Sequence, residues 1–290
     1  MILNLCSCTE KKITPTEKSS TTTQTEIQAP ATKRPKDDTD YSEHSFAIHY
    51  IDVGQGDAAL VVCDDKTMLI DGGEVDEADR LVDYLERQGV KTLDYAVCTH
   101  SHADHCGGLD KAIERFGAET VFTSPYTTEI NQYKQVVEAA DEVGAELCVP
   151  DFGAEYRLGE AVFTFIGPLE EYSDTNNNSL VLRLTYGDKS FLFTGDMERE
   201  AENDLLDSGV KLSSDVLKVG HHGSSTSTSY RFLYEVSPEI AVISCGEDNS
   251  YGHPHEEVLS RLSDADVTVY RTDLDGSVVL FCDGMKVTKK

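Results

Sequence analysis

The stretch that decides the fold of this chain is Thr99-His100-Ser101-His102-Ala103-Asp104-His105-Cys106-Gly107-Gly108, which follows an apolar, strand-like run. In an extended backbone alternate side chains point to the same side, so His100 and His102 can reach one ion while Asp104 and His105 reach a neighbouring position. Imidazole and carboxylate ligands suit zinc and also accept manganese or iron. The stretch therefore predicts a centre for two divalent ions and metal-assisted hydrolysis.

Two later segments place further ligands at the ends of apolar strands. Residues 191–196 form a strand-like run that ends in Gly195-Asp196, and residues 215–223 form another that ends in Gly220-His221-His222-Gly223. The first segment delivers a carboxylate at a strand tip, and the second delivers imidazole. Because a carboxylate can bridge two cations, the three segments together provide the ligands of a two-metal centre.

Short β-rich runs and helical periods alternate through the rest of the chain. Strands are expected at residues 46–53, 58–63, 67–70, 95–98, 161–166, 180–186, 191–194, 215–219, 240–244, 267–270 and 277–281. Helices are expected at residues 78–88, 108–116, 130–143, 198–207, 228–236 and 256–262. Two strand-rich halves with helices between them predict two sheets packed face to face, with the helices outside.

The three ligand segments, in this order, resemble the metallo-β-lactamase superfamily, whose HxHxDH loop, later Gly-Asp and final histidine hold two metals between two β-sheets. The resemblance covers residues 46–290 and implies a four-layer αββα sandwich of the α+β class. It implies these ligands: His100 and His102 for the first metal, Asp104, His105 and His221 for the second, and Asp196 as the bridge. Asp71, at an early strand end, matches the supporting aspartate of the family.

The flanking segments 51–58, 177–180, 221–224 and 251–254 resemble a narrower group, the hydrolase domain of the ComEC competence proteins. ComEC joins such a domain to membrane helices, whereas this chain is similar to the stand-alone relatives, so a role in DNA uptake does not follow. No histidine lies between His105 and His221, so the usual third histidine of the first metal is missing. Asn176-Asn177-Asn178 stands at about that place, and an amide oxygen there predicts a weaker first site that accepts manganese.

Several residues near these segments are expected to act on the substrate. His222 and His253 are the candidate proton donors to a leaving alkoxide, and they join Asp104 in the predicted catalytic set. Asp57 is interpreted either as a turn residue or as a support of the metal ligands. Three polar residues are expected to contact substrate: Asn178, Ser224 and Ser225. The two serines, with Thr226, most simply cap the next helix, although hydroxyls at a helix start also suit a phosphate oxygen.

The charge of the chain limits its substrates. The formal net charge is -28, and the first 43 residues hold six Lys or Arg against seven Asp or Glu, so nearly all of the excess belongs to residues 44–290. Such a domain repels a polyanion except where metals reverse the local potential. The phosphoester substrates considered are nucleic acid, a nucleotide and a phosphocholine-type ester, and the acidity favours a small or locally bound ester. No protein partner is predicted.

The sequence predicts phosphodiester hydrolysis by hydroxide that two zinc or manganese ions generate from water. One alternative is an acyl hydrolase that acts on a β-lactam, lactone or thioester, because the same fold supports that chemistry. The other is a non-catalytic, surface-tethered protein that binds metal or a partner. A closed structural zinc site does not need six ligands around two ions, which disfavours this last reading.

The N-terminal segment differs from the rest of the chain. Residues 9–40 are rich in Thr, Ser, Lys, Pro and Gln, so residues 1–43 are predicted to be a disordered tether and residues 44–290 the hydrolase domain. Leu5-Cys6-Ser7-Cys8 resembles the end of a truncated bacterial lipoprotein signal, which implies a lipid on Cys8 and the extracellular face of a bacterial membrane. Secretion and a cytoplasmic location are the alternatives. No apolar run approaches the roughly 20 residues of a transmembrane helix.

Overall fold

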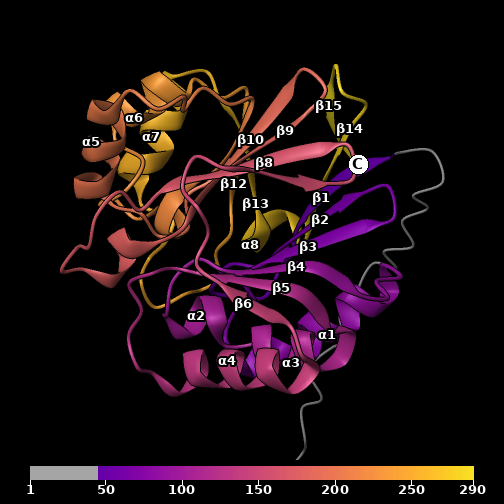
Figure 1. Ribbon diagram of the computed structural model, residues 1–290. Coiled ribbons are helices and arrows are strands. Elements are labelled where there is room, and N and C mark those ends of the chain that lie inside the picture. The colour runs from indigo at the N-terminus through magenta and orange to yellow at the C-terminus, as the bar shows by residue number, and fades with distance from the viewer. Residues whose placement is uncertain (1–44) are drawn as a thin grey trace, which may run out of the picture. The chain divides into compact units, whose positions relative to one another are not determined.

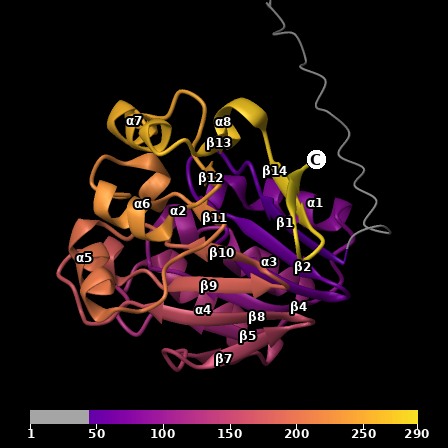
Figure 2. The ribbon, with the colours of Figure 1, turned by 90° about the horizontal axis from the view of Figure 1, so that it is seen from above.

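Two β-sheets form the centre of the computed structural model, which describes residues 45–290, and helices cover the outer face of each sheet (Figures 1 and 2). The predicted tether and the lipid site at Cys8 lie outside the described residues. The layers are therefore helix, sheet, sheet, helix, and the predicted αββα sandwich is confirmed. Among residues 45–290, no helix is both long and apolar enough to cross a bilayer.

The first sheet has eight strands, in the spatial order β15-β14-β1-β2-β3-β4-β5-β6. In that order their bounds are Val287–Lys289, Val278–Cys282, Phe46–Tyr50, Ala59–Cys63, Lys66–Ile70, Leu93–Cys98, Ala118–Thr123 and Glu146–Cys148. The second sheet has seven strands, in the order β13-β12-β11-β10-β9-β8-β7. Their bounds are Thr268–Arg271, Ile240–Ile243, Val216–Lys218, Lys189–Phe193, Val181–Tyr186, Ala161–Gly167 and Glu155–Leu158.

Helices pack on the outer faces of both sheets. The first sheet is covered by α1 (Ala78–Arg87), α3 (Leu109–Phe116) and α4 (Asn131–Val143), and the short α2 (Ala103–Cys106) precedes α3. The second is covered by α5 (Arg199–Ser208), α6 (Tyr230–Val236) and α7 (Glu256–Asp264), while α8 (Thr272–Asp275) follows β13. Single helical turns lie at η2 (Val75–Glu77), η3 (Thr175–Asn178) and η4 (Gly220–Gly223).

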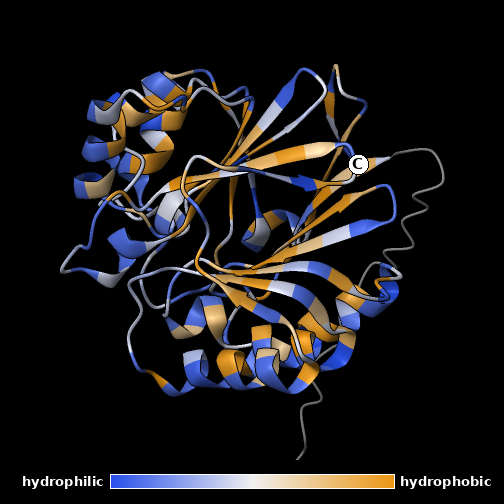
Figure 3. Cartoon of the chain, viewed as in Figure 1, coloured by the Kyte–Doolittle hydropathy of each residue, from blue (hydrophilic) through white to orange (hydrophobic). Residues whose placement is uncertain are grey.

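The central strands are buried on both sides, which explains why they are apolar at nearly every position. On β10, Phe191 and Phe193 point into the core between the sheets, whereas Leu192 points to the helices. Figure 3 shows the same pattern, with hydrophobic residues along the strands and hydrophilic residues on the outer sides of the helices. Three apolar layers therefore hold the fold together, one between the sheets and one under each helical layer.

Both sheets contain a parallel half, and this arrangement positions the site. Strands β3 to β6 are parallel to one another, and so are β10 to β13. The carboxyl ends of parallel strands meet at one edge of a sheet, where ligands are typically bound. The loops that leave β3, β4, β10, β11 and β12 therefore start at the edges where the two sheets can share a centre.

The sequence pattern missed four strands: β5, β6, β7 and β15. Three of them are short, and β6, β7 and β15 lie at sheet edges, where exposed polar residues interrupt the apolar pattern. The first strand also ends earlier than expected, at Tyr50 rather than at residue 53. Residues 51–57 leave the sheet there and turn back through glycines with positive φ at Gly54 and Gly56. Gly56 has no room for a side chain, since a Cβ atom would lie 2.4 Å from the Asp104 carbonyl oxygen.

Candidate metal centre

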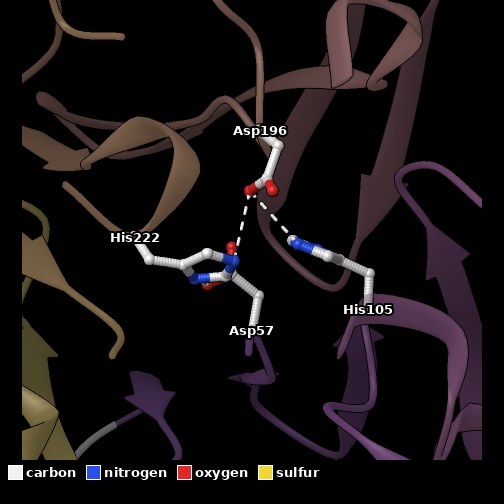
Figure 4. A group of neighbouring side chains, drawn as sticks. All are labelled: Asp57, His105, Asp196 and His222. Carbon is white, nitrogen blue, oxygen red and sulfur yellow. Dashed lines mark ion pairs between the residues drawn. The ribbon is translucent and has the colours of Figure 1, made fainter. Parts of the chain in front are cut away.

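The centre is assembled from loops at the carboxyl ends of the strands. Asp71 directly follows β3, the His100 to His105 segment follows β4, and Asp196 follows β10. His221 and His222 lie in the turn η4 after β11. Figure 4 shows His105 and Asp57 from the first sheet side by side with Asp196 and His222 from the second. The fold therefore brings together side chains that are far apart in the sequence.

One group of ligand atoms surrounds the Oδ1 atom of Asp196. His105 Nε2 lies 3.1 Å from this oxygen and His222 Nε2 lies 3.5 Å from it, while His222 Nε2 also lies 3.2 Å from Asp104 Oδ2. The atoms His105 Nε2, Asp196 Oδ1 and His222 Nε2 are buried, and none makes a well-directed hydrogen bond to any described residue. Buried polar atoms without partners are costly, and a divalent cation among them would satisfy all three. The residues present therefore fit a metal ion.

A second group faces the other oxygen of the same carboxylate. His100 Nε2 lies 3.9 Å and His221 Nε2 lies 3.7 Å from Asp196 Oδ2, and His100 Nε2 is 3.1 Å from His102 Nδ1. His100, His102 and Asp196 offer atoms that all lie within 4.8 Å of one another. Asp196 thus presents one oxygen to each group, which is the arrangement of a carboxylate that bridges two cations.

Carboxylates lie beside the outer nitrogens of three of these histidines. The Nδ1 of His105 lies 2.9 Å from a carboxylate oxygen of Asp71. The Nδ1 of His221 lies 3.0 Å from Glu198, and that of His222 lies 3.1 Å from Asp57. The His222 Nδ1 makes its hydrogen bond to the Ser244 carbonyl oxygen at 3.0 Å, and Asp57 Oδ1 makes no hydrogen bond within the described residues. A carboxylate at Nδ1 fixes the ring and leaves Nε2 for the metal, as is usual in metal sites. Glu198 was not predicted, although its place two residues after Asp196 could have indicated it.

The two adjacent histidines lie differently from the expected arrangement. We expected His221 beside Asp104 and His105, but the structure places His222 there and turns His221 to the other side of Asp196. Both residues have left-handed backbones, with φ of 50° and 52°, so their rings splay apart within one tight turn. His222 is 1% exposed and directs Nε2 into the centre, 3.5 Å from Asp196 Oδ1.

The cleft above the centre has a volume of about 370 Å³. Its walls are formed by Gln55, Glu74, His102, Ala103, Asp104, Asn176, Asp196, His221, His222, Tyr251 and His253. None of these described residues is a lysine or an arginine. Tyr251 is 64% exposed, and its ring stacks on that of His253 with centroids 5.6 Å apart. The cleft is therefore acidic, with an aromatic face at its rim.

The three residues that were expected to contact substrate do not line this cleft. The Asn178 amide binds the backbone of Tyr172, accepting from its N–H at 2.9 Å and donating to its carbonyl at 3.0 Å. Ser224 pairs with Thr226, and the Ser225 backbone N–H donates to His255. The neighbouring Asn176 lines the cleft instead, and its buried Oδ1 makes no hydrogen bond within the described part of the chain.

The electrostatics of the centre attract cations. Burial opposes a charge on Asp196, but the neighbouring His105 and His222 hold the pKa of this carboxyl well below its usual range. Burial opposes a charge on His105 and His222 as well, yet Asp196 and its neighbours raise the pKa of both imidazoles. Burial, assisted by His222 and His221, lowers the pKa of His253 to about 4, so this histidine is neutral at pH 7. The carboxylates therefore create a site where positive charge is stabilised.

Chelation should lower the thermal stability of the protein, because it leaves buried carboxylates without cations. Ligands present at about 100 times their dissociation constant stabilise by about 2.7 kcal/mol, which corresponds to a fall in Tm on the order of 5–10 °C when a chelator removes them. The measurement is a melting curve of zinc-loaded protein before and after treatment with EDTA. Excess zinc should restore the original Tm, and an unchanged Tm after verified removal of zinc would contradict this expectation.

A histidine and carboxylate centre at the edge of an αββα sandwich indicates the class of metal-dependent hydrolases. The chain belongs to the metallo-β-lactamase superfamily, since the family model described as "Metallo-beta-lactamase superfamily" matches residues 51–247. Two solved structures share the fold at low identity. The metallo-β-lactamase fold protein YhfI from Bacillus subtilis has a TM-score of 0.51 and 14% identity over 78% of this chain and 95% of its own. The metallo hydrolase Igni18 from Ignicoccus hospitalis has a TM-score of 0.51 and 17% identity, over 80% and 98%.

Curated relatives confirm the ComEC-like resemblance. ComE operon protein 3 of Bacillus subtilis is 30% identical over 250 residues, which cover 80% of this chain and 32% of that protein. Competence protein ComA of Neisseria gonorrhoeae is 35% identical over 239 residues, which cover 81% of this chain and 32% of that protein. Recombination protein 2 of Haemophilus influenzae is 30% identical over 82% of this chain. The chain thus spans about a third of the length of these relatives.

Proposed function

We propose that this chain is a metal-dependent phosphodiesterase that acts on small or locally bound phosphodiesters. The observation that carries the proposal is Asp196, whose two oxygens face two separate groups of histidines at the floor of an open cleft. Two bound divalent ions would supply a water of lowered pKa and offset the charge on the phosphoryl oxygens. The name of Recombination protein 2 supports a phosphodiester substrate, because recombination acts on DNA.

The proposed ligand sets follow the geometry of the two groups. We assign His100, His102, His221 and the Oδ2 of Asp196 to the first ion, and Asp104, His105, His222 and the Oδ1 of Asp196 to the second. His221 thereby takes the place of the missing third histidine of the first ion. Zinc and manganese are the proposed ions, since imidazole and carboxylate ligands suit both.

The remaining cleft residues would bind and orient the ester. His253 lies in the cleft outside both ligand sets, and its buried Nδ1 makes no hydrogen bond to the described residues, so we assign it to the leaving-group oxygen. The exposed face of Tyr251 offers a stacking surface for a planar substituent such as a nucleobase. The lack of lysine and arginine in the described lining disfavours a long polyanion, which needs many phosphate contacts.

Hydrolysis of chromogenic esters tests the proposed function. The full chain, loaded in turn with zinc and manganese, is expected to cleave bis-p-nitrophenyl phosphate and thymidine 5′-p-nitrophenyl phosphate but not a chromogenic cephalosporin. His102→Ala is expected to lower turnover at least about 100-fold, because it removes a direct ligand and outer-shell losses alone reach 10–100-fold. Asp188→Ala, in the turn between β9 and β10, serves as the control and should keep full activity. Cleavage of the cephalosporin alone would replace this proposal with acyl hydrolysis.

A further inference from the structure

Lys218 is a lysine buried directly beneath the metal centre, at the end of β11. Its side chain is 4% exposed, and Nζ lies 2.6 Å from Asp57 Oδ2. The same ammonium donates a hydrogen bond of 2.9 Å to the carbonyl oxygen of Val219. Lysine is almost never fully buried unless it is paired. Lys218 meets this condition through its pair with Asp57.

Asp57, the partner of Lys218, is held rigidly between the two sheets. Its backbone N–H donates to the Asp104 carbonyl at 3.0 Å, and its carbonyl accepts from Gly73 at 2.8 Å. Its Oδ2 faces Lys218, while its Oδ1 lies 3.1 Å from the Nδ1 of His222. The three side chains thus form a buried chain from an ammonium, through a carboxylate, to a histidine whose Nε2 points into the centre.

Lys218 also supplies a positive charge next to the aspartates that surround the centre. Four aspartates surround the centre: Asp57, Asp71, Asp104 and Asp196. Among residues 45–290, Lys218 is the one lysine or arginine that forms an ion pair with any of these four, since their other partners are histidines. The Asp57 carboxylate thus lies between the Lys218 ammonium and the His222 ring, whose Nδ1 also lies 3.0 Å from the Ser244 carbonyl oxygen.

We propose that Lys218 is a positioning residue of the metal centre: it fixes the Asp57 carboxylate, which holds the His222 ring with Nε2 directed at the second metal position. The inference rests on the proposed two-metal function, and it adds a residue that touches neither the metals nor the substrate. Because outer-shell partners typically contribute 10–100-fold to metal affinity, loss of Lys218 should weaken the second ion within that range. The first ion should be affected little, since His100 and His102 lie on the other side of Asp196.

Zinc titration of Lys218→Met tests this role without measuring catalysis. The variant is prepared both alone and together with His102→Ala, which removes a first-site ligand and isolates the second site. The dissociation constant of zinc at the second site is measured by competition with a chromogenic chelator. It is expected to rise about 10–100-fold relative to the same protein with Lys218 intact. Lys66→Met is the matched control, because Lys66 and Asp94 also pair at 2.6 Å but lie away from the centre. This control should bind both ions like the wild type.

The double variant Asp57→Asn with Lys218→Met covers the case in which the single variant does not fold. It removes both charges and so avoids an unpaired buried carboxylate, and circular dichroism verifies its fold. This double variant should also bind zinc at the second site more weakly than the wild type does. Wild-type affinity in either folded variant would overturn the role of Lys218. A wild-type protein that binds fewer than two zinc ions would instead overturn the proposed function, so the two failures are distinguishable.

Discussion

Replacing Asp196 with alanine is expected to remove both metal ions at once and to lower phosphodiester turnover at least about 1,000-fold, more than any loss of an outer-shell partner. The reason is geometric, because the two oxygens of this one side chain face the two groups of histidines. Asp196 is also buried, with 2% of its surface exposed. Metal content by mass spectrometry and turnover of bis-p-nitrophenyl phosphate are the two measurements.

Asp215→Ala is the matched control for this experiment. Asp215 precedes β11 in the same sheet, where its carboxylate pairs with Lys189 at 2.7 Å, and it does not line the cleft. The control should keep both metals and its activity. If Asp196→Ala retained one equivalent of tightly bound zinc, Asp196 would not be shared and the two-ion arrangement would have to be abandoned.

The largest loss of stability is expected for Phe163→Ala in the core between the sheets. Phe163 is fully buried, and its ring packs against Tyr95, Tyr156 and Phe165 with centroids 5.1, 5.4 and 5.8 Å away. Truncation removes apolar contacts and leaves a cavity, which costs about 3–5 kcal/mol of unfolding free energy for a buried phenylalanine. Chemical denaturation of the zinc-loaded protein measures this loss, and Tm should fall on the order of 10 °C.

Tyr234→Ala provides the comparison for this truncation. Tyr234 lies on α6 and is 85% exposed, so its loss should change the unfolding free energy by no more than about 0.5 kcal/mol. Phe163→Ala should still bind two zinc ions at low temperature, because the centre lies at the sheet edge and not in this core. Equal destabilisation by both substitutions would mean that the sheets are not packed through Phe163.

The fold class could be predicted because its signals are local. Apolar runs mark the buried strands, and the stretch from His100 to His105 places four candidate ligands in one loop. The structure brings this loop together with Asp196, whose position at a strand tip the sequence also indicated. Edge strands such as β6 and β7 were missed because their residues are partly exposed, so the apolar alternation that reveals a strand is weak there.

The finer parts of the centre depend on backbone geometry that the sequence does not display. His221 and His222 are adjacent, and only His222 faces Asp104. The left-handed backbone at both residues decides this. Likewise, the turn η3 directs Asn176 to the cleft and Asn178 to the backbone of Tyr172, although both belong to one run of asparagines. Residue type alone could not separate these neighbours, because their chemistry is identical and only their direction differs.

The ligands of the centre come from both sheets, and His222 lies far along the chain from His100. Chains are made from the N-terminus onward, so a nascent chain on the ribosome cannot present the complete set until β11 has emerged and docked. If the centre binds metal as proposed, uptake would be coupled to the last steps of folding. Because similar ligand sets accept several divalent ions, the free metal concentrations of the compartment in which folding is completed would then decide which ion is loaded.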